Sequence, residues 1–133
     1  MTILLSAGVL GTTLFVLVFL IDGATRSGYH PVRQPVSALA LGPRGWGQTT
    51  NFIVSGLLTA ASAAGVQLAT DSWWLAIPVG VFGTALVASG ALLLYFGTAW
   101  EADHPRAGLI QRLAIVVGWS WLGLTCWRLI VLG

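Results

Sequence analysis

The fold is decided by the stretch ILLSAGVLGTTLFVLVFLI, Ile3 to Ile21, in which every residue is uncharged. A helix that crosses a bilayer needs about 20 mostly apolar residues, so this stretch predicts a membrane span. It has no basic segment before it and no small-residue cleavage site after it. We therefore expect the helix to be retained and not removed as a signal peptide.

Composition extends this prediction to the whole chain. Of the 133 residues, 56% are hydrophobic and 8% are charged, whereas about 25% are charged in a typical soluble domain. The predicted spans are residues 3–21, 49–69, 74–98 and 109–132. A membrane β-barrel would show alternating segments of about ten residues, which this pattern does not resemble. We therefore predict one all-α domain over residues 1–133, an integral membrane four-helix bundle.

The connection between the first two spans, residues 22–48, is long and polar, with the sequence DGATRSGYHPVRQPVSALALGPRGWGQ. Most connections in compact domains have about 4–6 residues. Within this one, QPVSALALG predicts a short helix with Pro35 in its first turn and Gly42 as its stop. Tyr29 and Trp46 on either side favour the membrane interface. We expect a structured interfacial loop over one mouth of the bundle.

Small residues at spacings of four predict the packed helix faces, because helices in lipid associate by close approach. These residues are Gly56, Ala60 and Ala64 in the second span, Gly80, Thr84 and Ala88 in the third, and Gly118 in the fourth. The alternative is that alanine and glycine are simply common in membrane helices. Trp119 and Trp121 point about 200° apart on a helix. We expect one of them inside the bundle and the other against lipid or a partner.

Charged and polar side chains gather at the end of the bundle where the long loop lies. The candidate ligand-binding residues are Asp22, Arg26, Tyr29, His30, Arg33, Ser37, Arg44, Asn51 and Arg112. Asp22 and Arg112 sit at span boundaries, and we expect either that they pair or that each anchors its helix end in the headgroups. The excess of arginine in loops 22–48 and 99–108 predicts that this face is cytoplasmic, in a multi-pass protein of the inner (plasma) membrane.

No arrangement of residues predicts a reaction. Asp22, His30 and Ser37 contain the groups of a nucleophilic triad but no nucleophile elbow. His30, Glu101, Asp103 and His104 could bind a metal ion, but at no spacing typical of a metal site. We therefore predict no catalytic residue, no metal and no cofactor. A net charge of +2 that is scattered along the chain does not favour nucleic acid.

The loop and its flanks resemble the bacterial domain of unknown function 998 membrane family. The matching residues are Asp22, Gly23, Gly28, Tyr29, Ser37, Leu39, Gly45, Trp46, Asn51 and Phe52, and GLIQRLAIVVGWSWL, 108–122, is similar to the family's last span. Members usually have about six spans, so the resemblance implies a shortened, four-span version. His30 also stands where the family commonly has an acidic residue. The family's function is undefined, so the resemblance implies a membrane fold and no reaction.

Three functional hypotheses follow. The first is a non-enzymatic accessory or structural membrane component that forms a homo-oligomer or joins a larger membrane complex. The second is a binding module in which the arginine-rich face holds an anionic lipid headgroup or an anionic small molecule. The third is a membrane-embedded enzyme or transporter that uses Asp22, His30 and Arg112. The lipid bilayer is the partner common to all three.

Overall fold

The protein is built from four long helices and one short one. The computed structural model describes residues 1–96 and 107–132, with side chains described for residues 1–94, 116, 119, 120 and 122–131. The elements in chain order are α1 (Thr2–Thr25), η1 (Val36–Ala40, a 3-10 helix), α2 (Gly45–Thr70), α3 (Trp73–Phe96) and α4 (Ala107–Leu132). Between them these elements make an all-α fold.

The long helices are long enough to cross the hydrocarbon core of a membrane. They contain 24 to 26 residues, or about 36–39 Å at 1.5 Å per residue, whereas the hydrocarbon core is about 30 Å thick. Within the described residues, α1, α2 and the part of α3 from Trp73 to Leu94 are apolar enough to cross a membrane. The helices run beyond the predicted spans, α1 as far as Thr25 and α2 from Gly45, because backbone hydrogen bonding continues where apolar sequence stops.

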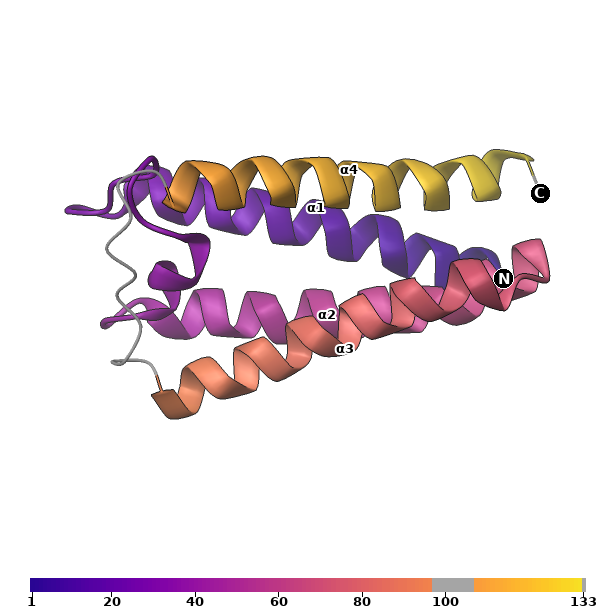
Figure 1. Ribbon diagram of the computed structural model, residues 1–133, viewed down its shortest axis with the longest axis horizontal. Helices are drawn as coiled ribbons and strands as arrows, with labels where there is room; N and C mark the ends of the chain where they lie inside the picture. The colour runs from indigo at the N-terminus through magenta and orange to yellow at the C-terminus, as the bar shows by residue number, and fades with distance from the viewer. Residues whose placement is uncertain (97–106, 133) are drawn as a thin grey trace.

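The four helices run alternately up and down (Figure 1). The N-terminus, the α2–α3 turn and the end of α4 lie at one end, and η1 lies at the other. Helix α4 packs on α1, α1 packs on α2, and α2 packs on α3. Among the described residues, α3 and α4 make few backbone contacts, although the rings of Phe82 and Trp119 meet at 5.3 Å. The bundle is therefore least closed between α3 and α4.

Glycines set the closest approaches between helices. An added Cβ on Gly8 would lie 2.7 Å from Cys126 Sγ of α4 and 2.8 Å from Ser62 of α2. One on Gly56 of α2 would lie 2.7 Å from the Gly83 carbonyl oxygen of α3. Such short distances leave no room for a side chain, so these glycines allow neighbouring backbones to pack against each other.

The packed face of α3 differs from the predicted one. The buried residues are Ala76, Val79, Gly83, Leu86 and Gly90, whereas Thr84 and Ala88 are exposed and Gly80 is half-buried. On α2, Gly56 is buried and Ala60 half-buried, but Ala64 is exposed. A step of four residues turns about 40° beyond a full helical turn, so a stripe at that spacing drifts away from the interface. Gly118 lies outside the described side chains.

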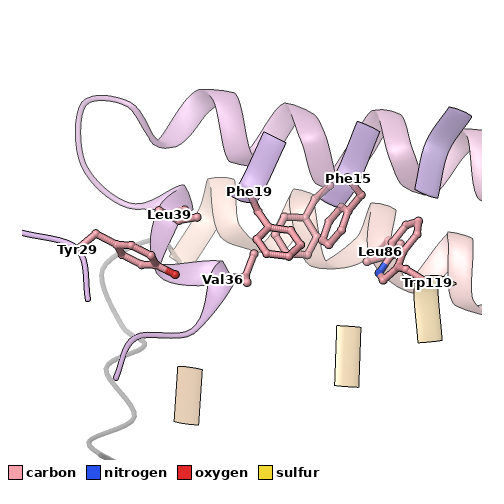
Figure 2. Close-up of a cluster of buried hydrophobic side chains, with 8 residues drawn as sticks. Phe15, Phe19, Tyr29, Val36, Leu39, Leu86 and Trp119 are labelled. Carbon is pink, nitrogen blue, oxygen red and sulfur yellow. The ribbon is translucent and has the colours of Figure 1, made fainter. Parts of the chain in front are cut away.

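The loop end is closed by a folded cap, which we define as residues 26–44 with η1 at their centre. Val36 and Leu39 are fully buried and join Phe15, Phe19 and Phe52 in one apolar cluster, which Figure 2 shows in part. Trp119 belongs to the same cluster and stacks on Phe15 at 4.5 Å. Trp119 is thus the inward-facing tryptophan of the pair considered above, and the Trp121 side chain lies outside the described residues.

Candidate functional site

A carboxylate that holds two arginines lies at the base of the cap. Asp22 is in the last turn of α1, Arg26 follows it by one turn, and Arg44 directly precedes α2. Asp22 Oδ2 lies 2.7 Å from Arg26 Nη2, and Asp22 Oδ1 lies 3.0 Å from Arg44 Nη2. We call these three residues the triad. It ties the end of α1 to the start of α2 and carries two positive charges against one negative charge.

The two arginines are held differently. Arg26 is largely buried, with 14% of its side chain exposed, and it donates to the Leu41 carbonyl oxygen at 2.8 Å. Its Nε atom is buried and has no acceptor. Arg44 is 55% exposed and donates to the Thr25 hydroxyl at 3.1 Å. Arg26 is therefore a fixed part of the cap, whereas Arg44 presents free guanidinium donors to the interface.

The other predicted residues of the loop fall into two groups. Tyr29 is buried against Gly23, and its hydroxyl lies 3.3 Å and 3.2 Å from the carbonyl oxygens of Gln34 and Pro35. Its role is to hold the cap together. His30 and Arg33 are exposed and Ser37 is half-buried in η1. The described side chains of His30, Ser37 and Asp22 are not joined by a hydrogen bond, and the Asp22 carboxylate contacts Arg26 and Arg44 instead.

Of the predicted pair of Asp22 and Arg112, the structure describes the side chain of Asp22 alone. The Arg112 side chain lies outside the described residues. Both Asp22 oxygens already have arginine partners, which sequence spacing did not indicate for Arg44, 22 residues away. Glu101, Asp103 and His104 also lie outside the described residues. In the described part of the chain, no group of three metal-ligating side chains comes together.

A second polar feature runs inward from the cap along α2. Gln48, Asn51, Ser55, Thr59 and Ser62 are all buried, with at most 4% exposed, on the face of α2 that meets α1. We call this row the polar seam. Asn51 Nδ2 donates to the Phe15 carbonyl oxygen of α1 at 3.2 Å, and Ser55 donates to Asn51 Oδ1 at 3.2 Å. The seam therefore links α2 to α1 through the hydrogen bond of Asn51, a polar contact of the kind that holds helices together in lipid.

The hydrogen bonds of Asn51 leave the side-chain amide nitrogen of Gln48 without an acceptor. A carbonyl oxygen can only accept, so Asn51 must turn its amide nitrogen toward Phe15. The same nitrogen lies 3.5 Å from Gln48 Oε1, which fixes the orientation of the Gln48 amide. Gln48 Nε2 is then fully buried with no partner. A buried amide nitrogen without a partner costs roughly 1–3 kcal/mol.

Of the polar seam, only Asn51 was among the candidate residues predicted from the sequence. Gln48 was assigned to the loop, and the serines and threonine of α2 are individually unremarkable in a membrane helix. The signal was present, because the positions are three or four residues apart and so share one helix face. What the sequence could not supply is that this face is turned toward α1 and not toward lipid.

The long apolar helices, their alternating direction and the cap at one end define a multi-pass helical membrane protein. Residues 9–98 match the family described as Protein of unknown function (DUF998). The match covers more than half of the chain, so the chain belongs to this family. It includes the triad, the cap and the polar seam, whereas α4 lies beyond it. No curated protein and no solved structure matches the chain.

Proposed function

We propose that this protein is a non-enzymatic accessory or structural component of the membrane, and that it associates with a second copy of itself through the outer face of α3. The observation that carries the proposal is that α3 is packed on one side only. Its glycines meet α2: an added Cβ on Gly90 would lie 2.8 Å from Ile53 and 3.1 Å from Phe52. The opposite side of α3 is exposed.

The exposed face of α3 has the chemistry of a helix–helix interface. Its small exposed residues are Thr84, Ala85, Ala88, Ser89 and Ala91. The Thr84 hydroxyl donates within its own helix, 2.9 Å from the Gly80 carbonyl oxygen, so it needs no outside partner. Small side chains bury little area against lipid tails but let a second backbone come close. Small residues on this exposed face therefore favour packing against a second helix.

Disulfide cross-linking in native membranes tests the proposal. The natural Cys126 is replaced by serine and a single cysteine is placed at Thr84. We expect Thr84→Cys to form a species of twice the 14.0 kDa chain mass under mild oxidation. Ala88→Leu in the same background should reduce that species at least about tenfold, because a larger side chain keeps the helices apart.

The matched control is Leu10→Cys, on the exposed face of α1. It should give little cross-linked product at the same expression level. Equal cross-linking at both positions would mean random collisions and would contradict the proposal. A Thr84→Cys product heavier than the dimer, identified by mass spectrometry as a different protein, would replace self-association with membership of a larger complex.

A further inference from the structure

We propose that the base of the cap is a binding site for a phosphate-bearing anion, supplied either by the headgroup of an anionic phospholipid or by free phosphate. The proposal does not depend on self-association through α3. Two independent features of the described residues support it, and both indicate the same missing partner.

The first feature is the charge balance of the triad. One carboxylate faces two guanidinium groups, at 2.7 Å and 3.0 Å, which leaves one positive charge without a counterion among the residues that the structure describes. Arg44 is the member that can accept one, because it is 55% exposed and its guanidinium has more donors than Asp22 and Thr25 occupy. Arginine binds phosphate oxygens through paired N–H groups more readily than lysine does.

The second feature is a pair of buried donors without acceptors, one in the triad and one on the next helical turn of α2. Arg26 Nε is buried without an acceptor, and so is Gln48 Nε2. Arg26 shares a carboxylate with Arg44, and Gln48 lies one helical turn after Arg44 in the chain. Among the described residues, charge and hydrogen bonding at the triad are thus unbalanced in the same direction, since two arginines share one carboxylate and Arg26 Nε has no acceptor. An anion with several acceptor oxygens would balance both.

The position in the membrane indicates a phosphate. The triad lies where α1 ends and α2 begins, and the exposed Trp46 follows within the first turn of α2. Tryptophan at a helix end marks the headgroup level of the bilayer, which is the level of lipid phosphates. Anionic headgroups attract arginine at this depth. The N-terminus of α2 adds the positive end of its helix dipole.

Native mass spectrometry of the full chain in mild detergent tests the site, with phosphatidylglycerol as the probe and phosphatidylcholine as the zwitterionic comparison. We expect phosphatidylglycerol to be retained at least tenfold more tightly. Arg44→Gln should lower its affinity by about tenfold or more, because a hydrogen bond to a charged group is lost. Arg128→Gln removes the same charge at the opposite end of the bundle and should leave the affinity within about twofold.

Inorganic phosphate separates the two sources of the anion. If millimolar phosphate displaces phosphatidylglycerol and raises the thermal stability of the wild type but not of Arg44→Gln, free phosphate is a ligand. If phosphate has no effect while phosphatidylglycerol binds, the ligand is the lipid. If neither probe binds the wild type better than Arg44→Gln, or if exposed Arg33→Gln loses as much affinity as Arg44→Gln, no specific site exists.

Asp22→Asn gives a test with a definite sign. Without the carboxylate, the two arginines lack any counterion, so affinity for phosphatidylglycerol should rise at least about threefold if the anion balances the triad. Circular dichroism checks that the variant keeps its helix content. A folded Asp22→Asn protein that binds phosphatidylglycerol more weakly than the wild type would overturn the proposal.

Discussion

Asn51 joins two helices through one side chain. Its amide nitrogen binds the backbone of α1, and its oxygen accepts from Ser55 on its own helix. In water such a bond would compete with solvent, but no solvent is available inside a bilayer. The Asn51 side chain therefore connects the polar seam to α1, and its loss should lower the stability of the fold.

We predict that Asn51→Ala lowers the free energy of unfolding by about 1–3 kcal/mol, because it removes the bond to Phe15 and leaves Gln48 Oε1 and Ser55 without a partner. Unfolding in mixed micelles with increasing SDS measures the change. Thr50→Ala is the control, since Thr50 is exposed on the same helix and should change stability by less than about 0.5 kcal/mol. Equal effects of the two substitutions would mean that the seam does not stabilise the fold.

Residue types alone predicted part of the candidate site. Asp22, Arg26 and Arg44 were chosen for their charge at the loop end of the bundle, and the structure places their side chains in contact. Tyr29 was chosen with them, but it is buried as a support of the cap. Charge and position along the chain show which end of the bundle a residue occupies. They do not show whether its side chain points to solvent or inward, which depends on the turns at Gly28 and Gly42, both with positive φ.

At the scale of one element, α3 carries two stripes, an inward one that packs on α2 and an outer one of small residues. The inward stripe has alternating steps of three and four residues, which keeps it in line with α2. The stripe at steps of four departs from it by about 120° between Ala76 and Ala88. Sequence spacing predicted the stripe at steps of four, whereas the structure shows that the other stripe meets α2.

The two stripes can be distinguished by adding one methyl group. An added Cβ on Gly83 would clash with the backbone of Ala60, whereas on Gly80 the nearest atom is Ala63 Cβ at 3.5 Å, an ordinary contact. We predict that Gly83→Ala costs about 1–3 kcal/mol, and that Gly80→Ala is neutral within about 0.5 kcal/mol. Both are measured by the same SDS titration. A larger loss of stability for Gly80→Ala than for Gly83→Ala would show that the outer stripe contributes more to the stability of the fold.

At the scale of the whole molecule, the two ends differ. One end has the cap and the triad. The other has the N-terminus, the end of α4 and a short turn at Asp71, whose φ of 50° is the one positive value at a non-glycine residue in the described chain. Arginines concentrate at the cap end, and the rule that positive loops stay inside predicts that this end is cytoplasmic.

Cysteine accessibility tests this orientation. In a Cys126→Ser background, we expect Asp71→Cys to react with a membrane-impermeant maleimide in intact cells, because the α2–α3 turn would face outward. His30→Cys, in the exposed part of the cap, should react only after the cells are permeabilised. The reverse labelling pattern would place the cap on the outside.

The sequence predicted the all-α membrane fold well, because the bilayer makes long apolar stretches almost sufficient to locate helices. It also predicted the short helix after Pro35, which forms as η1. It did not predict that α3 would contact α4 so little. Helix order and short connections are compatible with a closed or an open bundle, and the choice depends on side-chain packing such as that of Phe82 against Trp119.

The polar seam also bears on how the chain enters the membrane. Among the helices that the described residues show to be apolar enough to span the bilayer, α2 is the least hydropathic, and polar groups at the centre of a helix weaken its partition into lipid. Its polar face becomes favourable in lipid only once α1 lies beside it to accept the bond from Asn51. During synthesis α1 is made before α2, so α1 is already available as the packing partner of α2. The two helices should therefore leave the translocon as a pair.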